Sequence, residues 1–438
     1  MSKKSTVVAT VALIATLAVA LVVAGCGNGP RSRSTSVGAD TTSEMKTMAE
    51  YAEEFPHEYQ SSQQTRVNAK GFTIGHTVSN LRDICERPVM RDVNGDIEWN
   101  ADGTMSVFTS EYDEETGQYI VPELSDEQLA TLNLKSGCIS CKSSKFNEIY
   151  AQQGAAAYGN VYNGEARSIV NDEYWDCAMC HNGTPSAATV SPQLVYFQAL
   201  GEGLADKLDP KMAVCAQCHN SYDYRSSIKT EEDLETFKPY RYGNDVDAVF
   251  KSAYEDGVNF ADNDLGLPES YVVHANIEGY MGTTHYQMGV TCVDCHMPKT
   301  TDAETGKSYR SHFSANSPLE SEDSLNYCLT CHKSQGIEST EAMVDFVRAK
   351  ESAFASDLET LKADIDSYGT DLSNAIASGS MSEDAISQAK EDYARATWYY
   401  QVMITGPYES AGSQIAMVDS SGLLAKAHAS IDEGRGLI

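Results

Sequence analysis

Five pairs of cysteines share one spacing, and this pattern constrains the chain more than its length does. The stretches are CISCK from residue 138, CAMCH from 177, CAQCH from 215, CVDCH from 292 and CLTCH from 328. Four of the five pairs are followed directly by histidine, and the first is followed by Lys142. A disulfide framework does not call for a histidine after each pair, so a different chemistry must account for the pattern.

C-x-x-C-H is the attachment pattern of a c-type haem, in which both thiols form thioethers and the histidine binds the iron. Structural zinc sites instead bring two C-x-x-C pairs to one metal ion and do not require a histidine after every second cysteine. We predict haem attachment at Cys138, Cys141, Cys177, Cys180, Cys215, Cys218, Cys292, Cys295, Cys328 and Cys331. The predicted axial histidines are His181, His219, His296 and His332.

Lys142 sets the first motif apart. Alone, CISCK could equally be a zinc or disulfide pair followed by a surface lysine, but here it stands beside four haem motifs. A lysine amine can bind a metal once it is deprotonated, and burial shifts the pKa of lysine readily. The identity of the axial ligand strongly influences the reactivity of a haem, so we expect Lys142 to mark a haem whose role differs from that of the other four.

The N-terminus is predicted to be an export leader. A basic start, MSKK, precedes an apolar run that ends in VAGC at Cys26, which looks like a lipoprotein cleavage site. We expect residues 1–25 to be removed and Cys26 to carry lipid, the alternative being an uncleaved anchor. Residues 26–54 have no apolar period and are predicted to be a flexible tether. The body would then lie outside the cytoplasm, held at a membrane.

The formal net charge of −31 excludes one large class of partners. So acidic a chain repels phosphate backbones, and no basic stripe typical of nucleic-acid binding is present. If the substrate is an anion, positive groups must be concentrated at its site.

The number and order of the motifs resemble the ammonia-forming pentahaem cytochrome c nitrite reductases, whose catalytic haem is bound by C-x-x-C-K and whose other four use C-x-x-C-H. The resemblance covers about residues 55–405. It implies a mainly α multihaem fold with few strands over 55–332, in which five covalently bound haems c form much of the core. It also implies that nitrite is reduced to ammonium at the Lys142-ligated haem while the other four relay electrons.

The resemblance also implies distal ligands for three of the histidine-bound irons. His312 matches the distal ligand of the second haem, His76 that of the third and His285 that of the fifth. The family supplies the fourth from a stretch that ATWYYQVMITGPYESAG resembles, and this stretch contains no histidine. Met403, His428 or an open position remain as alternatives.

Three residues are implied over the reactive haem. Arg87, Tyr222 and His274 stand at or near the positions where the family has arginine, tyrosine and histidine. Donors aimed at developing negative charge stabilise such a reaction, and histidine and tyrosine can supply protons. The nearby alternatives are Arg82, Arg91 and Tyr224.

The family's calcium positions are altered in this chain. Ser221 and Val273 replace a glutamate and a glutamine, and Tyr271 replaces a nearby lysine. Calcium requires several oxygen ligands, so the loss of two side-chain donors makes a calcium site doubtful here. Arg225 is a candidate for the missing positive charge.

Two further segments have their own patterns. NADG between β-favouring runs predicts a β-hairpin inserted within residues 93–125. In 333–438, apolar residues from Met343 to Ile365 recur at helical spacing after Thr340, which is predicted to cap the helix. A second helix is expected from about Ser382 toward Gly406-Pro407, so this region is predicted to be a helical hairpin of the same domain.

Other functions and partners remain open. The chain could reduce a related small molecule such as hydroxylamine or sulfite, or could be a non-catalytic multihaem electron-transfer protein. The family implies a membrane quinol-oxidising electron donor, in many cases a multihaem cytochrome, and a homodimer built on the last helices.

Overall fold

The structure is a computed structural model of the whole chain. It describes residues 47–68, 111–113, 118–120, 135–162, 164–171, 173, 175–181, 204, 208–221, 228, 230–236, 238–271, 275–314, 317–404 and 422–438. No helix within these ranges is both long and apolar enough to cross a membrane.

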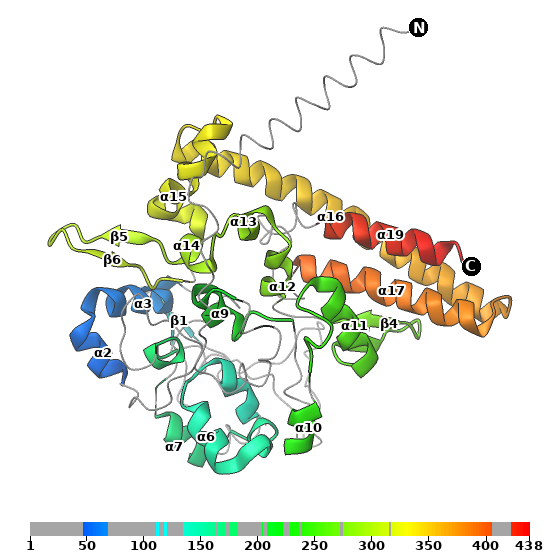
Figure 1. The fold of residues 1–438 in the computed structure, drawn as a ribbon, viewed down its shortest axis with the longest axis horizontal. Helices are drawn as coiled ribbons and strands as arrows, with labels where there is room; N and C mark the ends of the chain where they lie inside the picture. The colour runs from blue at the N-terminus through cyan, green and yellow to red at the C-terminus, as the bar shows by residue number, and fades with distance from the viewer. Residues whose placement is uncertain are drawn as a thin grey trace, which may run out of the picture.

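The described fold is mainly helical, as predicted, with many short helices and a group of long ones at one end (Figure 1). The first α-helices are α2 (Met48–Glu54), α3 (Pro56–Asn68), α6 (Phe146–Gln153), α7 (Gly164–Val170), α9 (Pro210–Ala216), α10 (Glu231–Thr236) and α11 (Val246–Asp256). They are followed by α12 (Asn276–Met281), α13 (Thr284–Gln287), α14 (Cys292–His296) and α15 (Glu322–His332). The 3-10 turns are η2 (Ser136–Cys141), η3 (Gly154–Tyr158), η4 (Cys177–Met179), η6 (Pro318–Glu320) and η7 (Lys333–Gln335).

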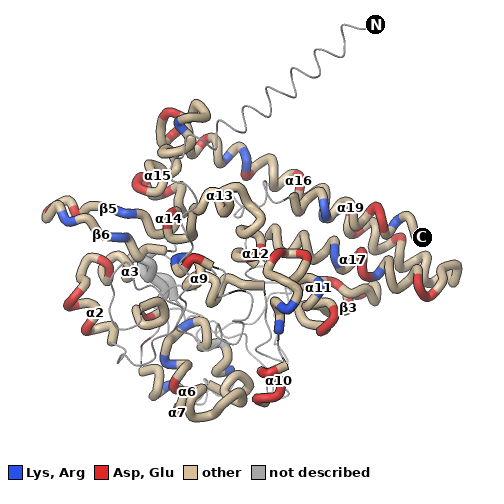
Figure 2. Tube along the Cα trace, in the orientation of Figure 1, with Lys and Arg blue, Asp and Glu red and all other residues tan. Residues whose placement is uncertain are grey.

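The strands of the described chain form three separate antiparallel hairpins. They are β1 (Glu111–Asp113) with β2 (Gln118–Ile120), β3 (Phe260–Asp262) with β4 (Pro268–Ser270), and β5 (Lys299–Thr301) with β6 (Ser308–Arg310). The β5–β6 hairpin projects from the body in Figure 1. Figure 2 shows basic positions along this hairpin, whereas α10 is acidic.

Local sequence signals explain where the short helices begin and end, and α11 is a clear case. The Asp245 carboxylate accepts the N–H groups of Asp247 and Ala248 at the start, and Gly257 ends the helix with a left-handed φ of 64°. Its apolar face is buried against Trp398, whose ring is 6.0 Å from that of Phe250. The helix therefore packs against the C-terminal region.

Three long helices form that C-terminal region: α16 (Thr340–Ser378), α17 (Glu383–Ile404) and α19 (Leu423–Arg435). They lie side by side at one end of the molecule (Figure 1). Gly434 of α19 allows close approach, because a Cβ there would lie 1.8 Å from the hydroxyl oxygen of Tyr368 in α16. That hydroxyl donates to the Ala389 carbonyl of α17 at 2.8 Å, so Tyr368 joins all three helices.

Several predicted boundaries are corrected. The tether placed at 26–54 ends earlier, because Thr47 and Glu50 form a capping box and Met48–Glu54 are helical. Ser339, one residue before Thr340, caps α16 by accepting the N–H of Ala342. The helical hairpin is a three-helix arrangement that includes α19.

The described part of the predicted hairpin insertion contains a hairpin. β1 and β2 flank residues 114–117 within the predicted 93–125. The NADG stretch at 100–103 lies outside the described residues.

Candidate haem-binding site

Each C-x-x-C motif lies on a single helical turn. The first and second lie on η2 and η4, the third begins in the last turn of α9, the fourth is α14 and the fifth ends α15. The N–H of His181 donates to the Cys177 carbonyl at 3.0 Å, and that of His219 to the Cys215 carbonyl at 2.9 Å. One turn separates the two sulfurs of a pair, so both are directed to one side and the axial candidate follows at its end.

Haem attachment requires cysteines that are not joined in disulfides. Six described cysteines of the second, third and fourth motifs are outside any disulfide: Cys177, Cys180, Cys215, Cys218, Cys292 and Cys295. The side chain of Cys138 lies outside the described residues.

His181 and His312 face each other as the two axial ligands of one iron would. Their ring centroids are 6.2 Å apart. An imidazole nitrogen lies about 2 Å from a bound metal ion, and the ring radius adds roughly 1 Å on each side, so two rings sharing a metal have centroids about 6 Å apart. The gap therefore fits one iron.

Hydrogen bonds orient the His312 ring for that role. Its Nδ1 lies 2.9 Å from the Arg310 carbonyl, to which it donates, and this leaves Nε2 with the lone pair that a metal needs. Its backbone N–H donates to the Ser61 hydroxyl at 2.9 Å. Hairpin β5–β6 and α3 together set its position.

His285 and His332 form a second pair of the same kind, with ring centroids 6.1 Å apart. His285 is in α13, which the Thr283 side chain caps, and His332 ends α15. The structure thus brings together the residues predicted to bind the fifth haem, with the spacing that one iron requires.

The third and fourth motifs have one described axial candidate each. The His219 Nδ1 is 3.0 Å from the Asn276 side-chain oxygen, which leaves Nε2 for iron. Its predicted partner His76 lies outside the described residues. His296 is exposed and lines a cavity of about 310 Å³ between α3, the β5–β6 hairpin and α15.

The two side chains considered for the fourth iron lie in the C-terminal helices. Met403 is fully buried within α17. His428 of α19 lies with its Nδ1 3.4 Å from the carboxylate of Asp364 in α16. The distal ligand of the fourth haem stays a prediction.

The motifs contact one another in a continuous series. The Cys218 thiol lies 3.5 Å from the Cys141 carbonyl, which joins the third motif to the first. The Cys292 thiol lies against Cys215, and this contact raises its pKa. Two side chains complete the series: Gln217 donates to the Met179 carbonyl of the second motif at 3.0 Å, and Ser324 of α15 donates to the Cys295 carbonyl at 2.8 Å.

Lys142 lies inside this series and is half-buried. Its N–H donates to the Ile139 carbonyl at 2.8 Å, and its carbonyl accepts the N–H of Trp175 at 2.6 Å. The backbone on both sides of the lysine is therefore fixed, and the second motif begins only two residues after Trp175.

Arg87, Tyr222 and His274, with Arg82, Arg91 and Tyr224, lie outside the described residues. Their neighbours Ser221 and Ala275 are fully buried. Glu278 of α12 joins these two flanking residues, and no motif in the sequence points to it. Its Oε1 accepts the N–H of Ser221 at 3.0 Å, the Ser221 hydroxyl at 2.9 Å and the Tyr240 hydroxyl at 2.8 Å. Burial raises the pKa of Glu278.

The calcium prediction also involves Ser221. Its hydroxyl donates to Glu278, whereas Val273 and Arg225 lie outside the described residues. Among the residues that the structure describes, no group of three histidines, cysteines or acidic residues could hold a metal ion.

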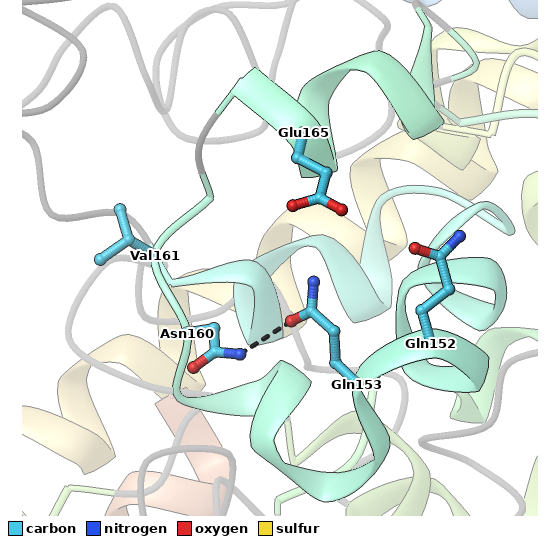
Figure 3. A pocket seen from close by; sticks show the side chains of 5 residues that line it. All are labelled: Gln152, Gln153, Asn160, Val161 and Glu165. Atoms are coloured by element: carbon cyan, nitrogen blue, oxygen red, sulfur yellow. Dashed lines mark hydrogen bonds between the residues drawn. The ribbon is translucent and has the colours of Figure 1, made fainter.

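A larger surface hollow, of about 480 Å³, lies elsewhere (Figure 3). Its lining side chains are Gln152, Gln153, Asn160, Val161 and Glu165. Asn160 donates to Gln153 across it at 2.8 Å. Because none of these five belongs to a haem motif, we assign the hollow no role in the redox chemistry.

Thiol pairs on single turns, imidazoles paired across a gap that fits iron, and a mainly helical fold define a multihaem c-type cytochrome. A family model described as cytochrome c552 matches residues 47–411. The chain belongs to the cytochrome c552 family, whose members carry covalently bound haem c and lie outside the cytoplasm.

The curated relatives have the same family name. Cytochrome c-552 of Haemophilus ducreyi is 30% identical over 268 residues, which are 55% of this chain and 49% of that protein. Cytochrome c-552 of Maridesulfovibrio salexigens is 29% identical over 229 residues, 49% of this chain and 44% of that protein. The matched part thus spans about half the length of these relatives.

A solved structure shares the fold. It is the catalytic subunit of cytochrome c nitrite reductase from Desulfovibrio desulfuricans, with a TM-score of 0.54 and 17% identity over 88% of this chain and 86% of that one. That catalytic subunit has two calcium sites. The predicted mainly α multihaem fold is confirmed.

Proposed function

We propose that this cytochrome carries five haems c and reduces nitrite to ammonium at the haem attached to Cys138 and Cys141, with Lys142 as its axial ligand. The observation that carries the proposal is Lys142 itself, which follows the second cysteine on a haem-attachment turn where the other motifs have histidine. A haem bound there would pass on electrons from the donor and offer the oxidant a binding site. A primary amine in place of imidazole changes its reactivity.

The chain's own residues would serve this reaction in three ways. The contacts between motifs would hold neighbouring haems close to one another, so that electrons could pass from the outer haems to the first. These contacts join the fifth motif to the fourth, the fourth to the third and the third to the first. The paired histidines would keep the second and fifth irons closed to substrate. Arg87, Tyr222 and His274 would bind the anion and supply protons.

The test uses the mature, haem-loaded protein reduced by a viologen dye. We expect added nitrite to reoxidise it and ammonium to accumulate. Lys142→Met should abolish most of the turnover. Lys145→Met is the matched control, because Lys145 lies three residues away and its amine binds the exposed Glu148 at 2.5 Å. Equal turnover in both variants would refute the role of Lys142.

A second candidate substrate is hydroxylamine, and one observation favours it. Glu278 places a buried carboxyl against Ser221, directly before Tyr222. If it is ionised, its negative charge opposes a bound anion but not a neutral molecule. A kcat/KM for hydroxylamine well above that for nitrite would favour this candidate. Sulfite is tested in the same assay, and reoxidation by none of the three would favour a non-catalytic electron carrier.

The remaining proposals concern location and partners. Residues 1–25 would be cleaved and lipid on Cys26 would hold the protein at the membrane, near a quinol-oxidising multihaem donor. Cys26→Ser should therefore release the protein from membranes without changing its haem content. The long helices α16 and α17 are the proposed contact of a homodimer, which light scattering would detect. Nothing in the charge pattern supports a nucleic-acid partner.

A further inference from the structure

The first and third haem motifs are held from outside by the same arrangement of hydrogen bonds. At the first motif, the N–H of Trp175 donates to the Lys142 carbonyl at 2.6 Å, and the N–H of Ser144 donates to the Asp176 carboxylate at 2.8 Å. Two consecutive residues, Trp175 and Asp176, therefore bind the axial residue and the residue two positions after it.

The third motif repeats this pattern with other elements. The N–H of Ile277 donates to the His219 carbonyl at 3.1 Å, and the N–H of Ser221 donates to the Glu278 carboxylate at 3.0 Å. Here too a backbone N–H binds the axial residue's carbonyl, and the carboxylate of the next residue binds the N–H two positions further on. We name each arrangement an axial clamp: Trp175–Asp176 on Lys142, and Ile277–Glu278 on His219.

Both clamps place a carboxyl group where its burial is costly. Asp176 is 5% exposed and Glu278 is 1% exposed. One carboxylate oxygen of each, Oδ1 of Asp176 and Oε2 of Glu278, is buried with no hydrogen-bond partner among the described residues. A buried, half-satisfied carboxyl is a poor way to stabilise a fold, since apolar residues would do so at less cost.

The first clamp also contains an unusual backbone conformation. Trp175 has φ of 50°, a left-handed value that residues other than glycine rarely adopt. Such strain persists where the surroundings fix it, and it is concentrated at functional sites. At the same place the Ser143 hydroxyl donates to the Glu173 carbonyl, so Lys142, Ser143 and Ser144 are each bonded to the segment 173–176.

We propose that Asp176 and Glu278 are positioning residues that fix the axial donors of the first and third haems. The part that concerns Asp176 rests on the proposed role of Lys142 as a ligand. A lysine amine ends a flexible stem of four carbons, so its direction depends on a fixed backbone more than that of a rigid imidazole does. Asp176 fixes the turn directly after Lys142, and Cys177 follows it, so the clamp also couples the first motif to the second.

The experiment compares a truncating and an isosteric variant at each clamp. Asp176→Ala removes the acceptor of the Ser144 N–H, whereas Asp176→Asn keeps an oxygen there and removes only the charge. Glu278→Ala and Glu278→Gln make the same comparison at the third motif. Asp245→Ala is the control, because its carboxylate also accepts backbone N–H groups but caps α11 away from the motifs.

The readouts are haem content, the spin state of each iron by electron paramagnetic resonance, and nitrite turnover. We expect Asp176→Ala to keep its haems, to alter the signal of the lysine-ligated haem alone and to lower kcat by about tenfold or more with little change in KM. Glu278→Ala should alter one low-spin signal, that of the third haem. The Asn and Gln variants should restore both signals, and Asp245→Ala should change neither.

The results separate this inference from the proposed function. If the wild-type protein lacks a lysine-ligated iron or nitrite turnover, the proposed function fails, and Glu278→Ala still tests the clamp at His219. If the wild-type protein shows both, unchanged spectra and turnover in Asp176→Ala and Glu278→Ala overturn the inference. Spectral changes shared by Asp245→Ala would also overturn it, because they would reflect a general loss of stability.

Discussion

The imidazole rings of His181 and His312 lie 6.2 Å apart by their centroids, although one belongs to a haem motif and the other follows a distant hairpin. The position of His312 depends on β6 and on Ser61 of α3, so tertiary structure rather than local sequence completes this pair. The same holds for His285 and His332. Both pairs therefore predict six-coordinate irons, and the spin state of each iron tests this prediction.

Replacing His312 tests the first pair. His312→Ala should convert one low-spin iron into a high-spin one, because the imidazole opposite His181 is lost. The measurement is the optical and electron paramagnetic resonance spectrum of the haem-loaded variant. His57→Ala is the matched control, since His57 stacks on Tyr309 of the same hairpin with centroids 5.2 Å apart. If His312→Ala kept the wild-type spectrum, another residue would have to be the distal ligand.

Sequence patterns predicted the parts of the site that are local. The C-x-x-C spacing requires a single turn, and the structure has such a turn at every motif. The resemblance predicts His285 and His312 as distal ligands, and their rings lie 6.1 Å from His332 and 6.2 Å from His181. The axial clamps had no sequence signal, because Asp176 and Glu278 act only on residues far away in the chain. Ser339, rather than Thr340, caps α16. Both serine and threonine are common N-caps, so two adjacent hydroxyl residues leave the first residue of the helix uncertain by one position.

Packing of the last helix depends on Gly434. A methyl group at this position would lie 1.8 Å from the hydroxyl oxygen of Tyr368 in α16. The Tyr368 side chain is fully buried and has no room to move away. Gly434→Ala should lower the free energy of unfolding by about 1–3 kcal/mol through overpacking. Thermal unfolding of the haem-loaded protein measures this change. Gly164→Ala is the control, because a Cβ there meets nothing within 4 Å, and equal losses in both variants would contradict the packing argument.

The junction of α11, α17 and α19 should make stability depend on pH. Burial of Asp247 opposes ionisation, but hydrogen bonds from Lys426 and Tyr399 outweigh it, so the pKa of Asp247 is lowered. A carboxyl with a lowered folded-state pKa contributes stability above its unfolded pKa of about 4, and that contribution is lost as the pH falls through the folded pKa.

The corresponding measurement is thermal unfolding from pH 7 to pH 3. Asp247→Asn should be less stable than the wild type near neutral pH, and the difference should shrink as the pH falls below about 4. Glu148→Gln serves as a control, since this exposed carboxylate pairs with Lys145 within one helix turn. A difference that stayed constant across this range would show that Asp247 does not titrate with folding.

The predicted pocket is tested by Arg87→Ala and His274→Ala. If these side chains bind the anion and supply protons, each variant should keep all its haems and lose nitrite turnover by roughly a hundredfold, the scale of one general acid or one preorganised donor. Loss of anion binding by Arg87→Ala should also raise KM, whereas His274→Ala should act mainly on kcat and shift its pH profile. Arg82→Ala and Arg91→Ala are the matched controls, because both arginines lie close to Arg87 in sequence. If Arg82→Ala or Arg91→Ala abolished turnover and Arg87→Ala did not, the pocket arginine would be Arg82 or Arg91. If none of the three variants lost turnover, residues other than these arginines would have to bind the anion.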